Sequence, residues 1–330
     1  MKILIIQTAF IGDVVLATAL VEKLYVSHTS AEIHFLLRKG NEGLLEGHPL
    51  IRKTWIWDKQ RSKYRNLLRL LQLIRKEQFD WVVNCQRFAS SGFLTAFSGA
   101  KNKTGYAKNP FSFLFTRKYS HVIGKRGETE FLHEVERNQH LISSISGGNA
   151  ANPGLYPSVI DIEKVRVYQG RKYVTICPAS VWFTKQLPKV RWAELINKMP
   201  SAYTIYLLGA TGDKELCDEI IELTTAKNIV NLAGTLSFLQ TAALMKDAAM
   251  NYTNDSAPLH FASAMKARVT AVFCSTIPQF GFGPLSAESH LLEEKEQLYC
   301  RPCGLHGYRT CPEKHFKCAA DIKLAAFLNE

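Results

Sequence analysis

The chain has 330 residues, of which 46% are hydrophobic, so we expect two packed domains and exclude a disordered chain. No run of 18 uncharged apolar residues and no signal-peptide pattern occurs, so we expect no membrane span and a cytoplasmic protein whose eight cysteines are mostly reduced. The net charge of +12 favours a polyanionic partner.

Strand and helix patterns alternate through the first half of the chain. Short apolar runs predict strands, and apolar residues at helical spacing predict helices. The expected strands are residues 2–7, 32–37, 54–57 and 80–85, and the expected helices are residues 13–25 and 61–76. Such an alternation predicts a parallel sheet.

An Asn/Pro/Gly-rich patch at residues 150–157 predicts a linker, after which the alternation restarts. The expected strands are then residues 173–177, 204–208, 229–232, 250–253 and 269–273, and the expected helices are residues 192–198, 213–225, 236–245 and 258–265. We therefore predict an α/β protein of the GT-B class, with two Rossmann-like domains, 1–155 and 156–330, that face a central cleft.

The positive charge is concentrated in the first half. Residues 1–150 hold 22 Lys and Arg against 12 Asp and Glu, whereas residues 151–330 hold 19 against 17. The densest run comprises Arg52, Lys53, Lys59, Arg61, Lys63, Arg65, Arg69, Arg75 and Lys76. Such a run attracts nucleic acid, an anionic membrane or a phosphorylated substrate, although a solvated helix face has the same composition.

The turn between the first strand and the first helix ends in Gly12 and Asp13. The carboxyl ends of strands in open α/β sheets border the ligand site, so Asp13 is well placed to act as a base. The alternative is that Asp13 only caps the helix. The turn lacks the G-x-G-x-x-G pattern of dinucleotide-binding domains, which disfavours a dehydrogenase.

Two further segments follow strands of the second half. Asp255 and Ser256 open a helix in which Ser256 is the expected N-cap and Pro258 lies in the first turn. The amides of this turn are suited to bind a pyrophosphate, although an ordinary capped helix has the same pattern. Ser180 and Lys185 follow the first strand of this half, and Lys185 is suited to neutralise a diphosphate, although most lysines are solvated.

Together these segments resemble glycosyltransferase family 9, the ADP-heptose:lipopolysaccharide heptosyltransferases. The likeness runs in order through nearly the whole chain. Its motifs are Ile11-Gly12-Asp13, His133-Glu134-Val135-Glu136-Arg137-Asn138, Lys185 with Leu187-Pro188, Leu208-Gly209-Ala210, Leu232-Ala233-Gly234, and Asn254-Asp255-Ser256 with His260. The resemblance implies an inverting, metal-independent transfer of heptose from ADP-heptose to the inner core of lipopolysaccharide, at the cytoplasmic face of the inner membrane and without a nucleic-acid partner.

The resemblance also assigns roles to single residues. It implies that Asp13 is the general base and that Lys185 stabilises the departing diphosphate. The implied donor-binding residues are Ser180 and Lys185 for the phosphates, Asp213 for the ribose, Leu236 for the adenine, Asp255 for the donor sugar and phosphate, the amides of Ser256 and Ala257 for the diphosphate, and His260. The basic charge, rather than a family motif, leads us to expect that domain 1–155 binds the anionic glycolipid acceptor through Arg61 and Arg65, and domain 156–330 is then expected to bind the donor.

Two departures from the family pattern concern the donor side. Leu187 stands where members often have Trp, and Ala257 stands where many have Gly. They leave open a second hypothesis, in which the protein is a related GT-B enzyme that uses another nucleotide sugar. A third hypothesis is a catalytically silent module that binds an anionic glycolipid through the basic half, but the presence of Asp13 and Lys185 speaks against it.

Four cysteines lie within a short C-terminal segment: Cys300, Cys303, Cys311 and Cys318, with His306 and His315 nearby. The spacing suggests a structural zinc site, and reduced or transiently oxidised thiols and disulfides are the alternatives. No cofactor is expected to be required for catalysis. The other cysteines, Cys85, Cys177, Cys217 and Cys274, lie in or beside apolar segments and are expected in the cores.

Overall fold

The computed structural model describes residues 1–324 and divides the chain into two compact units. The first unit comprises residues 1–123 and 132–156, and the second comprises residues 124–131 together with the chain from Pro157 onward. The segment 124–131 therefore packs with the second unit, although it lies inside the range 1–155 of the predicted first domain. The last six residues of the predicted range 156–330 lie outside the described residues.

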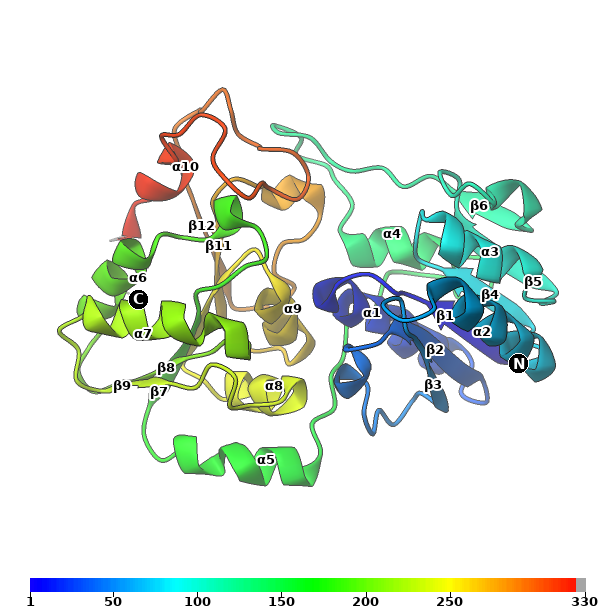
Figure 1. Cartoon of the computed structure of the whole chain (residues 1–330), viewed down its shortest axis with the longest axis horizontal. Coiled ribbons are helices and arrows are strands. Elements are labelled where there is room, and N and C mark those ends of the chain that lie inside the picture. Colours follow the sequence, from blue (N-terminus) through cyan, green and yellow to red (C-terminus); the bar gives the residue numbers. More distant parts are fainter. Residues whose placement is uncertain (325–330) are drawn as a thin grey trace. The chain divides into compact units, whose positions relative to one another are not determined.

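The first unit is a parallel six-stranded sheet with helices packed on it (Figure 1). Its strands are β1 Lys2–Ile6, β2 Glu32–Arg38, β3 Lys53–Trp57, β4 Trp81–Asn84, β5 Asn102–Tyr106 and β6 Arg117–Tyr119. Its helices are α1 Ile11–Ser27, α2 Lys63–Glu77, α3 Ala89–Phe97 and α4 Glu134–His140, with short 3-10 turns at Glu42–Leu44 and Ser112–Leu114. The strand order is β3-β2-β1-β4-β5-β6, so the direction of winding reverses between β1 and β4.

The apolar pattern explains why this sheet forms. Every residue of β1 from Ile3 to Ile6 is inaccessible to solvent, as expected for a parallel strand that is covered on both faces. The α2 helix contributes Leu67, Leu70 and Ile74 to the same core. The helix begins at Lys63 rather than at residue 61. Leu68 is 53% exposed because the buried positions of the helix recur at spacings of three and four.

The second unit repeats this plan with a second parallel six-stranded sheet. Its strands are β7 Tyr173–Cys177, β8 Thr204–Leu207, β9 Ile229–Asn231, β10 Met250–Asn254, β11 Val269–Phe273 and β12 Ser289–Glu293. Its helices are α5 Val159–Val165, α6 Lys189–Asn197, α7 Lys214–Glu222, α8 Phe238–Lys246, α9 Ala257–Ala264 and α10 Lys317–Ala320, with 3-10 turns at Arg166–Tyr168, Phe183–Lys185, Thr211–Asp213 and Pro278–Phe280. The order β12-β11-β10-β7-β8-β9 reverses between β10 and β7.

These two reversals matter for function. Neighbouring loops diverge at such a point, so ligands of open α/β sheets bind beside the carboxyl ends of the two strands concerned. In the first unit these strands are followed by the turn that holds Asp13 and by Cys85. In the second unit they are followed by the segments that hold Lys185 and Asp255.

Candidate active site

Asp13 lies in the first turn of α1, directly after the turn that leaves β1. The main-chain NH of Phe10 donates to Asp13 Oδ2 at 3.1 Å, so the carboxylate supplies one half of a capping box at the start of the helix. The side chain remains half-buried at the reversal between β1 and β4. The capping interaction and the position expected of a base therefore coincide in one residue.

The turn before Asp13 is fixed by Thr8, Gln86 and Lys59, for which no such role was predicted. Thr8 Oγ1 donates to Gln86 Oε1 at 2.6 Å, which ties the end of β1 to the segment after β4. Lys59 Nζ donates to the main-chain oxygen of Thr8 at 2.7 Å. Burial, with the nearby charges of Arg38 and Lys63, lowers the pKa of Lys59 to about 8. Thr8, Gln86 and Lys59 each follow a strand, and this position could have identified them, because the carboxyl ends of parallel strands share one edge of the sheet.

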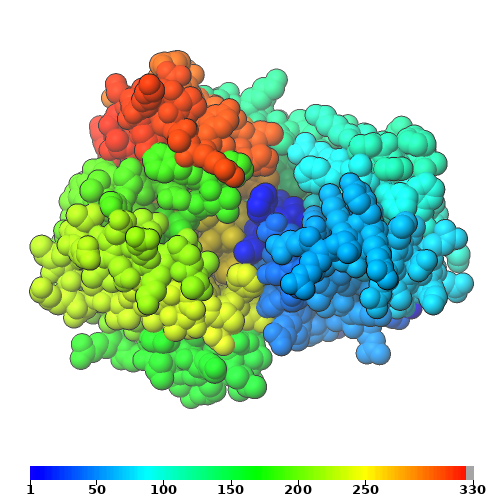
Figure 2. Space-filling model, viewed as in Figure 1, coloured from blue at the N-terminus to red at the C-terminus, as the bar shows by residue number. Residues whose placement is uncertain are grey.

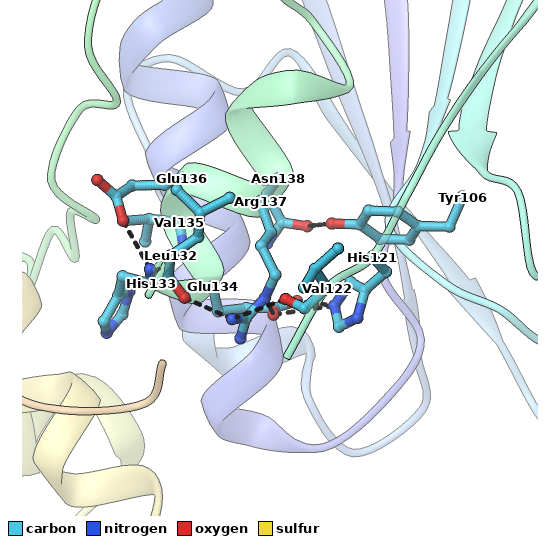
Figure 3. A network of polar contacts seen from close by, with 10 residues as sticks. All are labelled: Tyr106, His121, Val122, Leu132, His133, Glu134, Val135, Glu136, Arg137 and Asn138. Atoms are coloured by element: carbon cyan, nitrogen blue, oxygen red, sulfur yellow. Dashed lines mark hydrogen bonds and ion pairs between the residues drawn. The ribbon is translucent and has the colours of Figure 1, made fainter. Parts of the chain in front are cut away.

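A buried polar network joins α4 to Tyr106, the last residue of β5, and to His121, which follows β6 (Figure 3). Arg137 Nε donates to Glu134 Oε2 at 2.8 Å, and His121 Nε2 lies 3.1 Å from the same oxygen. Tyr106 donates its hydroxyl to Asn138 Oδ1 at 2.8 Å. Burial alone would raise the pKa of Glu134, but the hydrogen bond of His121 and the charge of Arg137 together hold it below its usual value.

The network and Asp13 share one neighbour. Cys85, the first residue after β4, is buried, and its thiol pKa is raised by that burial and then by the carboxylates of Glu134 and Asp13. Glu134, in the motif that begins at His133, and Asp13 therefore both act electrostatically on the thiol that follows β4.

The predicted acceptor residues are exposed. Arg61 precedes α2 and Arg65 lies in its first turn, so the expectation that both belong to one helix is wrong for Arg61. Its main-chain NH instead donates to Asp58 Oδ1 at 3.1 Å. Within residues 1–324 no carboxylate forms an ion pair with either guanidinium, which leaves both cations available to a ligand.

In the second unit, Lys185 and Asp255 meet at the reversal between β7 and β10. Lys185 Nζ lies 2.7 Å from Asp255 Oδ2, and Thr276 Oγ1 donates to the same oxygen at 2.6 Å. The side chain of Asn254 joins the two loops, because it accepts from the NH of Leu187 at 3.0 Å and donates to the main-chain oxygen of Pro178 at 2.7 Å. The sequence did not identify Thr276, although it too follows a strand.

The helix that follows Asp255 has the predicted N-cap residue but lacks a side-chain capping hydrogen bond. Ser256 occupies the N-cap position, but its side chain makes no capping hydrogen bond and its hydroxyl instead lies 3.4 Å from the oxygen of Asn254. Ala257 is the first helical residue, and Pro258 lies in the first turn as expected. His260 is 5% exposed, so it belongs to the packed side of the helix.

The remaining predicted donor residues follow β7 and two further strands of the same sheet. Ser180 follows β7, and its main-chain oxygen accepts from the side chain of Gln186. Asp213 follows β8 and accepts from the NH of Ala210 at 2.7 Å, so its carboxylate stabilises the turn that leaves the strand. Leu236 is half-buried in the loop between β9 and α8. All three lie on the carboxyl edge of the sheet that carries the Lys185–Asp255 pair.

The four C-terminal cysteines are not gathered into a ligand set. Cys300 Sγ lies 3.8 Å from His315 Nε2, and Cys303 Sγ lies 3.1 Å from the main-chain oxygen of Cys300. Across residues 1–324 no three His, Cys, Asp or Glu side chains are arranged to hold a metal ion, so the geometry does not fit the predicted zinc. The other four cysteines are buried as expected: Cys85, Cys177, Cys217 and Cys274.

The chain is similar in sequence to known heptosyltransferases over most of its length. The family model described as glycosyltransferase family 9 (heptosyltransferase) matches residues 67–313, more than half of the chain. The lipopolysaccharide heptosyltransferase 1 of Campylobacter coli is 23% identical, and the alignment covers 84% of each chain. The lipopolysaccharide heptosyltransferase 3 of Escherichia coli K12 is 25% identical, with 80% of each chain covered.

Solved structures agree with the fold. The E. coli ADP-heptose lipopolysaccharide heptosyltransferase II superimposes with a TM-score of 0.75 at 20% identity, covering 97% of this chain and 98% of its own. The family 9 glycosyltransferase of Veillonella parvula has a TM-score of 0.78 at 18% identity, covering 88% and 85%. The predicted α/β fold of the GT-B class is confirmed by these likenesses and by the two parallel sheets.

Proposed function

Since the chain belongs to glycosyltransferase family 9, the heptosyltransferases, and is thus a glycosyltransferase, we propose that it transfers heptose from ADP-heptose to the inner core of lipopolysaccharide. The observation that carries the donor half of this proposal is the convergence of Lys185 and Thr276 on Asp255 beside the first turn of α9. This arrangement offers a cation and helix amides where a diphosphate would bind.

The donor would bind along the carboxyl edge of the second sheet. Lys185, Ser180 and the amides at Ser256 and Ala257 would hold the phosphates, and Asp255 would hold the donor sugar. Asp213 would accept from the ribose hydroxyls, and the loop at Leu236 would contact the adenine. The order of these residues on four neighbouring strands, β9, β8, β7 and β10, supports an extended ligand such as a nucleotide sugar.

Asp13 would act as the general base. Its carboxylate removes the proton from an acceptor hydroxyl while that oxygen attacks the anomeric carbon of the donor, and the bond from this carbon to the ADP oxygen breaks on the opposite face. One displacement inverts the anomeric configuration. Negative charge develops on the departing diphosphate, and the ammonium of Lys185 stabilises it without a metal ion.

The acceptor would be an anionic glycolipid bound through the basic first unit, with Arg61 and Arg65 facing its phosphates or carboxylates. Exposed guanidiniums bind such groups well because they donate two parallel hydrogen bonds. We place this reaction at the cytoplasmic face of the inner membrane, which the enzyme would contact peripherally. Among the described residues, every helix is too short or too polar to cross a bilayer.

The second candidate is a transferase of the same fold that uses another nucleotide sugar. Leu187 contributes little to this alternative, because its side chain is 2% exposed and belongs to the core of the second unit. Ala257 remains relevant, because it is the first residue of α9 and its methyl group lies beside the amides proposed to bind the diphosphate.

Thermal unfolding with a panel of nucleoside diphosphates tests the donor. We expect ADP to raise the melting temperature in proportion to the logarithm of its concentration, whereas UDP and GDP have no effect at equal concentration. Stabilisation by UDP or GDP and not by ADP would contradict the ADP-heptose proposal and favour the second candidate.

A further inference from the structure

The turn that carries Lys185 is bonded to a C-terminal segment that the catalytic proposal does not use. Residues 301–308, called the strap from here on, run past the 3-10 turn Phe183–Lys185. The NH of Thr184 donates to the oxygen of Tyr308 at 3.1 Å, and the NH of Tyr308 donates to Thr184 Oγ1 at 2.8 Å. In Figure 2 the orange part of the second unit lies directly against its green part, which contains this turn.

Thr184 also binds the segment after β11. Its main-chain oxygen accepts from the NH of Ser275 at 3.2 Å, and its Oγ1 accepts from the hydroxyl of Ser275 at 3.0 Å. Thr184 is 1% exposed and Ser275 is inaccessible, so water does not compete for these bonds. Every polar group of Thr184 is thereby used to hold two other segments.

The residues that follow Thr184 and Ser275 in the sequence both bind Asp255. Lys185 follows Thr184, Thr276 follows Ser275, and both side chains bind the same oxygen, Asp255 Oδ2. The pairing of Thr184 with Ser275 therefore sets where the ammonium of Lys185 and the hydroxyl of Thr276 converge. A shift of the turn by one hydrogen-bond length would move the ammonium away from the site proposed for the diphosphate.

The strap is itself firmly attached to β11. The buried guanidinium of Arg301 donates to the main-chain oxygens of Cys274 at 2.8 Å, Thr276 at 2.9 Å and Phe273 at 3.1 Å. The NH of Cys303 donates to the oxygen of Ser275 at 2.8 Å. The strap thus rests on the same strand end that supplies Thr276.

Gly307 lets the strap approach Lys185 closely. Its φ of +75° is rarely adopted by residues with a side chain, and a Cβ at this position would lie 2.8 Å from Thr184 Oγ1 and 3.1 Å from Lys185 Cγ. Any side chain at position 307 would press on the stem of the lysine. The glycine is therefore suited to a position in direct contact with the Lys185 turn.

We propose that Thr184 and Gly307 are positioning residues for Lys185, and that the strap holds its ammonium against Asp255 at the point where the diphosphate departs. This inference rests on the role proposed for Lys185. It adds that the geometry of the reaction depends on a segment remote in sequence from Lys185.

Thr184→Val tests the inference, because it removes the hydroxyl at nearly constant volume. We expect turnover to fall by about tenfold or more, as a displaced catalytic group does, with the acceptor KM unchanged and Thr184→Ser restoring most of the rate. Thr175→Val is the matched control, because it removes a hydroxyl that is equally buried but bonds Asn251, away from the Lys185 turn. It should lower the melting temperature and leave turnover nearly unchanged.

A double-mutant cycle separates positioning from general stability. In a Lys185→Ala background, Thr184→Val should cause little further loss of turnover, because the group it positions is gone. An equal loss in both backgrounds would overturn the inference while leaving the function of Lys185 intact. If Lys185→Ala alone keeps full turnover, the proposed function of Lys185 fails instead. Should Thr184→Val not fold, Gly307→Ala serves in the same cycle with the same expectations.

Discussion

Glu134 and Arg137, one helical turn apart on α4, form an ion pair from which solvent is almost excluded. His121 binds the same carboxylate, and Arg137 also donates to the main-chain oxygen of Leu132. Such a pair need not be more stable than an apolar contact of the same size, but removal of one partner leaves a buried charge. The pair therefore makes the first unit sensitive to single substitutions in the motif that begins at His133.

Arg137→Met should destabilise the first unit by about 3–5 kcal/mol, because it leaves the Glu134 carboxylate without its cation. The double variant Glu134→Gln/Arg137→Met should recover much of this loss. Urea unfolding measures both, with a separate transition fitted for each unit. Equal destabilisation in the single and double variants would contradict the argument.

The same pair predicts a pH dependence. The folded pKa of Glu134 is below its usual value of 4.5, so the carboxylate stabilises the fold above that pH, and this contribution is lost as the pH falls through the folded pKa. The difference in unfolding free energy between wild type and Glu134→Gln should therefore shrink as the pH is lowered below about 4.5. A difference independent of pH between 3 and 7 would assign the effect to hydrogen bonding alone.

Asp13→Asn should lower turnover by about 10²-fold or more, as expected when a general base is removed. The amide can still accept from the NH of Phe10, so the melting temperature and ADP affinity should stay close to wild type. Steady-state kinetics and calorimetric titration with ADP measure these effects. Near-normal turnover in Asp13→Asn would reduce this residue to a helix cap.

Lys185→Ala should weaken ADP binding and slow transfer, because it removes the cation proposed to face the diphosphate. Transfer by the wild type should persist in EDTA. A rate that is lost in EDTA and restored by magnesium or manganese would contradict a metal-independent mechanism, whatever the effect of the substitution.

Arg61→Glu/Arg65→Glu should raise the apparent acceptor KM at low salt and leave the donor KM nearly unchanged. Exposed charges are screened within about 8 Å at physiological ionic strength, so the effect should shrink as salt is added. Arg171→Glu/Lys172→Glu is the matched control, because it makes the same change in net charge at exposed positions of the second unit. If both double variants respond alike, net charge rather than a local acceptor site is responsible.

The predicted zinc stays open to a direct measurement. Elemental analysis of protein purified without added metal should give well below one zinc per chain, because the described cysteines are not arranged as a ligand set. About one zinc per chain, reduced in Cys300→Ser/Cys303→Ser, would contradict this expectation. A zinc-free protein in which Cys300 and Cys311, the two partly exposed thiols of the group, react with a thiol reagent would support reduced cysteines instead.

The sequence predicted best those elements whose pattern is strong. The strands at residues 173–177 and 269–273 were predicted with the observed bounds, because both are fully buried apolar runs. The strands β5 and β6 were missed, since the sequences NKTGY and RKY contain little apolar pattern. They owe their structure to pairing, β5 with β4 and β6 with β5.

Site residues followed a similar rule. Although their roles came from the family resemblance, position after a strand singled out Asp13, Lys185 and Asp255 as candidates, because parallel strands bring their carboxyl ends to one edge. It could not reveal that Thr276 and Lys185 share an oxygen of Asp255, or that Ser256 makes no capping bond, since both depend on how loops from distant parts of the chain pack.

The assignment of residues 124–131 to the second unit has a consequence for recombination between relatives. The chain passes from one unit to the other at three points, after Ile123, Phe131 and Tyr156. A hybrid joined once, at the linker, would bring in a foreign second unit but retain the native Arg126, whose guanidinium binds the oxygens of Leu298 and Arg301. A hybrid that exchanges the whole second unit therefore has to take two segments from the same parent: the eight residues 124–131 and the chain from Pro157 onward.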